Sequence, residues 1–272
     1  MPTVKVGDIN IYYEVHSKGE ALVLIMGYTA STAWWFQEVP VLSQKYRVVV
    51  FDNRGSGQSD KPDVPYTMEM MAGDLAGLLE AIGINAAHIF GVSMGGMIAQ
   101  HFALRYPERV ISLILGCTLC GGPHTIMPDA EAMTVLVDFE HMQKLTPEES
   151  VREMISFLVS QEFIDKNPGR IKEAMAKMME HPAPLHGAMR QAQAITGHDT
   201  YERLPEIRVP TLVIAGDADR LIPVENSRIL ASRIPRSQLV ILKNMGHGFI
   251  TEAADEANRA VLDFLRRHRR SG

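Results

Sequence analysis

Ile89-Phe90-Gly91-Val92-Ser93-Met94-Gly95-Gly96 is the stretch of sequence that decides the fold. It joins an apolar strand, a G-x-S-x-G sequence and the start of a helical pattern, which is the context that a nucleophile elbow requires. Glycines two residues before and after Ser93 leave room for a tight turn between strand and helix. The stretch therefore predicts that Ser93 stands above a sheet, at a helix N-terminus, as a nucleophile.

Other short apolar runs surround this stretch, and they are nearly continuous, as expected of strands buried on both faces. The predicted strands span residues 21–26, 46–51, 87–91, 110–116, 211–215 and 239–242. Helical patterns alternate with them at 67–82, 94–106 and 223–234, after an opening hairpin around Gly7-Asp8. This order predicts an α/β fold with a mostly parallel central sheet flanked by helices.

The alternation breaks between residues 121 and 204, where helical stretches at 148–162 and 169–180 replace the strand-like runs. We expect an inserted helical cap at 121–204, on a core formed by 1–120 and 205–272. Eight of the 16 methionines lie in this segment. Thioether side chains suit an adaptable wall for an acyl group, and they equally suit the internal core of a cap.

Length and charge limit the functional classes. The chain has 272 residues, enough for one domain with a modest insertion. A net charge of -5 gives no broad positive field for nucleic acid or anionic lipid. The sequence shows neither a signal segment nor an apolar run that could span a bilayer. We therefore expect a cytoplasmic monomer or homodimer, with no nucleic-acid or membrane partner.

The two cysteines, Cys117 and Cys120, form a single C-x-x-C at the end of a very apolar stretch. No further cysteines are present to complete a zinc site. We interpret them as buried reduced thiols rather than as a redox or metal site.

Several stretches together resemble the α/β-hydrolase superfamily over essentially the whole chain. Besides the elbow, residues 51–59 (FDNRGSGQS) are similar to the D-x-R-G-x-G-x-S loop of that family. We interpret this loop as structural, with Arg54 donating to carbonyls or a carboxylate. The resemblance implies the α/β-hydrolase fold and is strongest to the branch of carboxylesterases and enol-lactonases. Serine at the elbow argues against haloalkane dehalogenases and epoxide hydrolases, for which the resemblance implies aspartate.

A serine hydroxyl needs a base at neutral pH, and the pKa of histidine suits both taking and returning the proton. Among the ten histidines, His247 is the candidate general base. It lies in the loop after the last apolar run, and such a loop passes over the carboxyl edge of a parallel sheet.

One carboxylate must hold that imidazole in the right tautomer. Asp217 and Asp219 both follow the penultimate apolar run. The resemblance to the family's G-x-x-D-x-x-x-P pattern implies Asp219, and the swapped assignment to Asp217 stays open. The resulting order of Ser93, Asp219 and His247 is the order described for this fold.

An oxyanion forms during acyl transfer, and two backbone amides are expected to bind it. Met94, directly after the nucleophile, supplies the first amide. The resemblance implies Tyr28 for the second, because residues 25–28 (IMGY) occupy the place of the family's H-G-x segment. Met26 stands where histidine is common, which leaves the neighbourhood drier without removing the amide.

Together these features predict a serine hydrolase of the carboxylesterase (EC 3.1.1) type that cleaves small or medium esters through an acyl-enzyme. We expect a small-molecule ester substrate, no organic cofactor and no metal. Enol-lactonase, cofactor-free perhydrolase and carbon–carbon bond hydrolase activities stay open, because their elbows resemble this one. The non-enzymatic alternative is a hydrolase-fold receptor for a small ligand.

Overall fold

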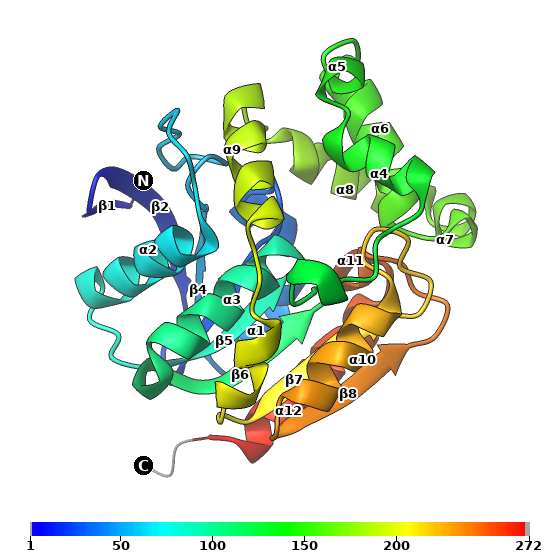
Figure 1. Ribbon diagram of the computed structural model, residues 1–272. Coiled ribbons are helices and arrows are strands. Elements are labelled where there is room, and N and C mark those ends of the chain that lie inside the picture. The colour runs from blue at the N-terminus through cyan, green and yellow to red at the C-terminus, as the bar shows by residue number, and fades with distance from the viewer. Residues whose placement is uncertain (1, 270–272) are drawn as a thin grey trace.

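The computed structural model describes residues 2–269. An eight-stranded sheet with the strand order β1-β2-β4-β3-β5-β6-β7-β8 runs through it, and helices cover both faces (Figure 1). The strands are β1 (Thr3–Val6), β2 (Ile9–His16), β3 (Ala21–Ile25), β4 (Arg47–Phe51), β5 (Ala87–Val92), β6 (Val110–Gly116), β7 (Thr211–Gly216) and β8 (Ser237–Leu242). The pairs β1–β2 and β2–β4 are antiparallel, and β3 to β8 are parallel. The predicted α/β class and mostly parallel sheet are confirmed.

Two sets of helices sandwich the sheet. On one face lie α2 (Met68–Ala81), α3 (Met94–Arg105) and α10 (Val224–Arg233), and on the other lie α1 (Glu38–Leu42) and α12 (Ala254–Arg267). A short helix, α11 (Phe249–Glu252), precedes α12. Among the described residues, four 3-10 turns complete the connections: η1 (Thr32–Trp35), η2 (Pro107–Arg109), η3 (Gly122–His124) and η4 (Tyr201–Glu206).

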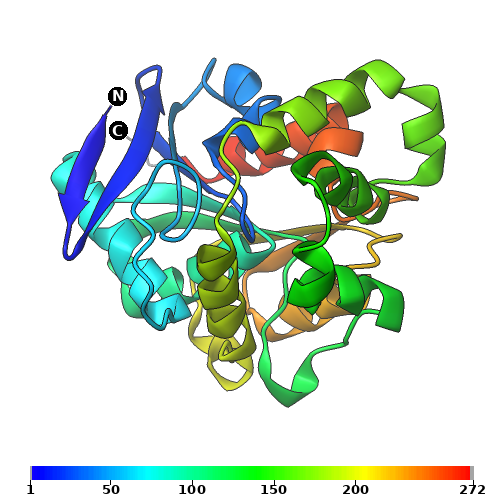
Figure 2. The same ribbon diagram turned by 90° about the horizontal axis from the view of Figure 1, so that it is seen from above.

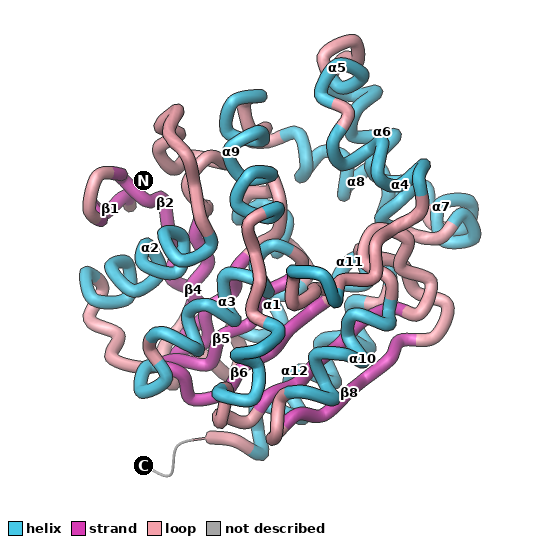
Figure 3. Tube along the Cα trace, viewed as in Figure 1, coloured by secondary structure: helices cyan, strands magenta, loops and turns pink. Residues whose placement is uncertain are grey.

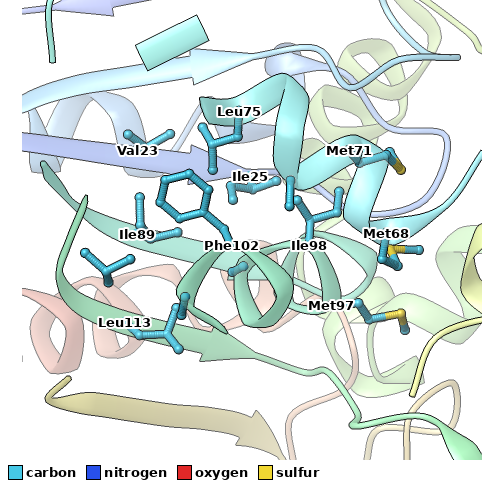
Figure 4. Close-up of a cluster of buried hydrophobic side chains, with 14 of the residues drawn as sticks. Val23, Ile25, Met68, Met71, Leu75, Ile89, Met97, Ile98, Phe102 and Leu113 are labelled. Carbon is cyan, nitrogen blue, oxygen red and sulfur yellow. The ribbon is translucent and has the colours of Figure 1, made fainter. Parts of the chain in front are cut away.

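Strand β3 shows why the apolar runs are continuous. Val23 belongs to the core cluster under α2 and α3, whereas Leu22 and Leu24 belong to the cluster on the opposite face. Figure 4 shows Val23 among side chains such as Leu75 of α2 and Phe102 of α3. Because successive side chains of a strand point to opposite faces, a strand covered on both sides needs apolar residues at every position.

The segment between β6 and β7 forms the helical insertion, a name we use for the six helices that follow. They are α4 (Ala130–Val137), α5 (Phe139–Met142), α6 (Pro147–Leu158), α7 (Gln161–Lys166), α8 (Pro168–Met179) and α9 (Leu185–Thr196). Figure 3 shows helices and loops above the sheet, and Figure 2 shows α4–α8 gathered on the side away from β1 and β2. The two ends of the insertion meet in an isolated antiparallel bridge between Gly121 and Asp199.

The helix predicted over 148–162 is wrong in extent, because the chain turns at Val159 and Ser160 between α6 and α7. Ser160 is the N-cap of α7, and its Oγ accepts from the N–H of Phe163 at 3.2 Å. Serine at this position ends one helix pattern and starts another. Within residues 2–269, none of the helices combines the length and apolar character needed to cross a membrane.

Candidate active site

Ser93 lies at the sharp turn between β5 and α3, with a backbone φ of 56°. Two glycines make this turn possible. A Cβ at Gly91 would lie 2.2 Å from the carbonyl oxygen of Gly95, and a Cβ at Gly95 would lie 2.1 Å from that of Ile25. Since such contacts are repulsive, only glycine fits at both positions, and the strained turn presents Ser93 at the start of a helix.

The loop after β3 passes directly beside Ser93. A Cβ at Gly27 would lie 3.0 Å from the Cβ of Ser93 and 3.4 Å from its Oγ. The next amide, that of Tyr28, and the amide of Met94 have no hydrogen-bond partner among the described residues. Two amides, one in the loop after β3 and one at the first residue of α3, are thus free to donate to a group held near Ser93.

Side chains from elsewhere in the chain hold this loop in place. Asn53 Nδ2 donates to the carbonyl of Met26 at 2.9 Å. Buried Gln191 of α9 accepts from the N–H of Thr29 at 2.8 Å and donates to the carbonyl of Arg54 at 2.8 Å. The guanidinium of Arg54 donates to both carboxylate oxygens of Asp74 in α2, which confirms its predicted structural role.

His247 and Asp219 form a buried pair. The Nδ1 of His247 and the Oδ2 of Asp219 lie 2.8 Å apart. The other oxygen of Asp219 accepts from the N–H groups of Leu221 at 2.9 Å and Ile222 at 2.8 Å, so the carboxylate is fixed from both sides. Asp217 is exposed, and its Oδ1 instead accepts from the N–H of Asn244 at 2.5 Å. The structure therefore brings Asp219 rather than Asp217 to His247.

The loop that carries His247 is held by close backbone approaches. A Cβ at Gly216 would lie 2.0 Å from the carbonyl oxygen of Met245. A Cβ at Gly246 would lie 2.5 Å from that of Leu158, which also accepts from the N–H of Gly248 at 2.6 Å. The His247 loop is thereby wedged between β7 and the end of α6.

The electrostatic surroundings of His247 favour its charged form. Burial of the imidazole opposes charging, but the negative charge of Asp219 and the nearby thiol of Cys117 outweigh it, so the pKa of His247 is raised well above the usual 6.5. The Sγ of Cys117, a carboxylate oxygen of Asp219 and a ring nitrogen of His247 all lie within 4.8 Å of one another.

Ser93 and His247 line one cavity between the sheet edge and the helical insertion, and Tyr28 and Cys117 line it with them. Its walls are mainly apolar. Those from the sheet side include Met26, Trp34, Phe36, Val92 and Leu221, and those from the insertion include Leu136, Met154, Ile155, Leu158, Ile171 and Met178. Among the described lining residues, Lys177 carries the one permanent charge, and its Nζ donates to Glu180 at 2.6 Å.

The structure thus gathers the predicted site residues at one edge of the sheet. Each follows the carboxyl end of a parallel strand, as the sequence predicts: Tyr28 after β3, Ser93 and Met94 after β5, Asp219 after β7 and His247 after β8. Such residues can jointly perform nucleophilic attack, proton transfer and oxyanion binding on one carbonyl group.

Some contributors to this site escaped the sequence analysis. Cys117 directly follows β6, so its position indicated the same carboxyl edge of the sheet, whereas the apolar stretch before it indicated only burial. Two polar contributors gave no signal: Gln191 of α9, and Glu252 of α11, whose buried carboxylate accepts from the N–H of Gly246 at 2.8 Å. A polar residue in a helix is usually read as part of a solvated face. The interpretation of Cys117 and Cys120 as free buried thiols is confirmed.

Comparison with known proteins covers nearly the whole chain. A family model described as alpha/beta hydrolase fold matches residues 20–254. The protein named "Putative carbamate hydrolase RutD" from Azorhizobium caulinodans is 30% identical over 266 residues, 97% of this chain and 98% of that protein. The enol-lactonase from Burkholderia xenovorans superposes with a TM-score of 0.85 at 25% identity, covering 97% and 100% of the two chains. A thermophilic esterase from Thermogutta terrifontis, with malate bound, gives a TM-score of 0.85 at 29% identity, covering 99% and 100%.

Proposed function

The chain belongs to the α/β-hydrolase family, and from that premise we propose that it is a serine hydrolase that cleaves carboxylic esters through an acyl-enzyme. One observation carries the proposal: Ser93 and His247 line the same cavity, and His247 is bound on its other side by buried Asp219 at 2.8 Å. A nucleophile, a base and a carboxylate that orients the base are the parts required for attack on an acyl carbon.

In the proposed reaction, Ser93 Oγ attacks the ester carbonyl while His247 takes its proton. Asp219 keeps Nδ1 protonated, so that Nε2 faces the nucleophile, and stabilises the imidazolium that forms. The amides of Tyr28 and Met94 bind the oxyanion of the tetrahedral intermediate. His247 then gives its proton to the leaving alcohol, and water, activated by the same imidazole, releases the acid from Ser93.

The cavity wall supports an ester of small or medium size with an apolar acyl group. Its apolar side chains favour hydrocarbon over charged groups, because a charge brought there would lose its hydration. The charge of Lys177 is already paired with Glu180. We propose that residues 121–204 act as a substrate-binding cap on the core of residues 1–120 and 205–272, since α6 and α8 supply much of this wall.

Carbamate hydrolysis is the second candidate, favoured by the relative that carries that name at 30% identity. A carbamate carbonyl presents the same attack geometry to Ser93. Its nitrogen donates electron density to the carbonyl carbon, which makes attack harder than on an ester. The predominantly apolar wall suits a hydrocarbon ester better than a small polar carbamate, and we therefore place ester cleavage first.

The test compares wild type, Ser93→Ala and Ser232→Ala on p-nitrophenyl acetate, p-nitrophenyl butyrate and a p-nitrophenyl carbamate. Exposed Ser232 of α10 serves as the matched control. We expect Ser93→Ala to lose on the order of 10⁴-fold or more in kcat, because the nucleophile is removed. Ser232→Ala should match wild type.

Equal turnover by Ser93→Ala and wild type would refute the mechanism. A higher kcat/KM for the carbamate than for either ester would replace the first candidate with the second. Binding of ester analogues without turnover by wild type would instead support a receptor. Circular dichroism of Ser93→Ala checks that the lost activity does not reflect a lost fold.

A further inference from the structure

Cys117 occupies a position at the sheet edge that the proposed reaction does not use. It directly follows β6, with a φ of 39°, and its N–H donates to the carbonyl of Ile214 at 2.9 Å. Its side chain is buried in the molecule yet lines the cavity that Ser93 and His247 share. The backbone of Cys117 is thus held by β7, and its side chain lines the cavity.

Three different donor atoms converge at this point. The Sγ of Cys117, a ring nitrogen of His247 and a carboxylate oxygen of Asp219 lie within 4.8 Å of one another. In residues 2–269, this is the one group of three or more Cys, His, Asp or Glu side chains with such convergence. The group is buried, but Cys117 and His247 reach the cavity, which gives an ion a route to it.

The donor set matches the preferences of zinc. Zn²⁺ binds thiolate, imidazole and carboxylate at about 2.0–2.3 Å, and three protein ligands leave one position for water. Tetrahedral ligands at that radius are roughly 3.3–3.8 Å apart. The three donors lie within 4.8 Å of one another, and His247 Nδ1 and Asp219 Oδ2 are 2.8 Å apart, so small side-chain movements would bring them to this spacing. Hard cations such as Mg²⁺ and Ca²⁺ prefer oxygen ligands and fit this set poorly.

We propose that Cys117, His247 and Asp219 form an inhibitory binding site for a soft divalent cation of the zinc class. When the metal–sulfur bond forms, the thiol of Cys117 releases its proton to solvent. The bound ion occupies the imidazole and carboxylate that the proposed general base requires. Inhibition of ester cleavage rests on the proposed function, whereas binding of the ion does not.

Cys120 offers a matched control within the same C-x-x-C. It is also free and buried, but its Sγ contacts the carbonyl of Gly121 at 3.6 Å, and it belongs to the core cluster on the α3 face. Burial raises the pKa of the Cys120 thiol to about 11, which disfavours the thiolate that a metal needs. Among the described residues, Cys120 belongs neither to the cavity wall nor to the group of three donors.

The experiment measures metal binding directly on the full chain. Wild type, Cys117→Ala, Cys117→Ser and Cys120→Ala are titrated with Co²⁺, whose bond to a thiolate gives a near-ultraviolet charge-transfer absorption. Zn²⁺ affinity is then measured by competition with a chromophoric chelator. We expect one ion per chain with the thiolate band in wild type and Cys120→Ala. Both Cys117 variants should lose the band and bind Zn²⁺ on the order of 100-fold more weakly, because hydroxyl and methyl groups are poor replacements for a thiolate.

Inhibition is measured on p-nitrophenyl butyrate, with each variant referred to its own metal-free rate. The Zn²⁺ concentration for half-inhibition should rise with the loss of affinity in the Cys117 variants and stay at the wild-type value in Cys120→Ala. Equal Zn²⁺ binding by wild type and both Cys117 variants would overturn the site. A thiolate band without inhibition would overturn the inhibitory role. If wild type hydrolyses no ester, the proposed function fails, while the Co²⁺ band still decides the metal site.

Discussion

The carboxyl edge of the sheet and the helical insertion both line the active-site cavity, but the contacts that hold them differ in kind and proportion. At the edge, backbone approaches backbone so closely that one added methyl group would collide, as at Gly95 against Ile25 and Gly216 against Met245. The insertion meets that edge at fewer such approaches, for example Gly246 against Leu158. It is further fastened to the edge by polar side chains, among them Gln191 of α9 and Glu252, which accepts from Ser160. Backbone collisions leave no alternative geometry, whereas a side-chain hydrogen bond can be weakened gradually.

This difference separates two kinds of change. A substitution of a reacting group at the rigid edge should remove orders of magnitude in turnover without moving the wall. We call the contacts that Gln191 and Glu252 make between this edge and the insertion the seam. A substitution at the seam should act indirectly and lower turnover by less. Three predictions test this division.

Of these three, the largest effect is expected at Asp219, with Asp217 as its matched control. Asp219→Asn removes the charge that supports the imidazolium of His247 and can present the wrong hydrogen-bonding group to Nδ1, so kcat should fall by about 10²–10⁴-fold. Asp217 is exposed and serves a loop amide, which an asparagine oxygen can still accept from. Asp217→Asn should therefore stay near wild type in steady-state kinetics on p-nitrophenyl butyrate. An equal loss of kcat in both variants would contradict the assignment of Asp219 as the carboxylate that orients His247.

The second prediction concerns pH, because only the neutral imidazole can accept the proton of Ser93. Burial of His247 works against its charging, but Asp219 and Cys117 together raise its pKa well above 6.5. Protonation of a base at low pH abolishes its function. The profile of kcat/KM against pH should therefore have its acid midpoint above pH 6.5, and kcat/KM should fall about tenfold for each pH unit below that midpoint.

Asp219→Asn sharpens this test, since loss of the carboxylate charge removes a cause of the raised pKa. The acid limb of the kcat/KM profile of Asp219→Asn, measured on its remaining activity, should move to lower pH. A wild-type limb centred at or below 6.5 would contradict the electrostatic account of His247.

The rigid edge was also the part that the sequence predicted best. Glycines at fixed distances from Ser93 predict the elbow because no other residue fits the turn. The resemblance of Gly216, Asp219 and Pro223 to the family's pattern implied Asp219 while Asp217 stayed open, and in the structure it is Asp219 that lies 2.8 Å from His247. Here local sequence determines local geometry, and the sheet only has to bring the strand ends together.

The insertion and its seam were predicted less well, for a physical reason. The helix break at Ser160 has a local cause, the cap on Phe163, which the helical pattern of 148–162 obscured. The other partner of the Ser160 hydroxyl, Glu252, is 92 residues away in the chain. Cys117 lies beside His247 because β6 and β8 both flank β7, an order that composition and periodicity do not specify. Contacts between distant segments, such as these, therefore escaped prediction.

The third and smallest effect is expected at Glu252, which joins the His247 loop to the insertion. One of its oxygens accepts from the N–H of Gly246 at 2.8 Å, and the other from the N–H of Ser160 at 3.1 Å and from the Ser160 hydroxyl. The carboxylate is buried and accepts at both ends. Glutamine has the same size but replaces one acceptor with an NH₂ group, which must then face a donor.

Glu252→Gln should consequently leave one buried N–H unpaired, which destabilises the protein by about 1–3 kcal/mol. It should also loosen the residue before His247, and since misplacement of a catalytic group by about 1 Å can cost roughly 100-fold, a partial shift should lower kcat about tenfold. The control is Glu256→Gln, at an exposed position of α12. Ser160→Ala, which removes only the hydroxyl, should fall between the two. Thermal unfolding and kcat at 25 °C are measured for each variant. A variant that loses stability but keeps the wild-type kcat would show that the seam supports only the fold. A tenfold loss of kcat with KM retained would show that the insertion helps to position the catalytic base.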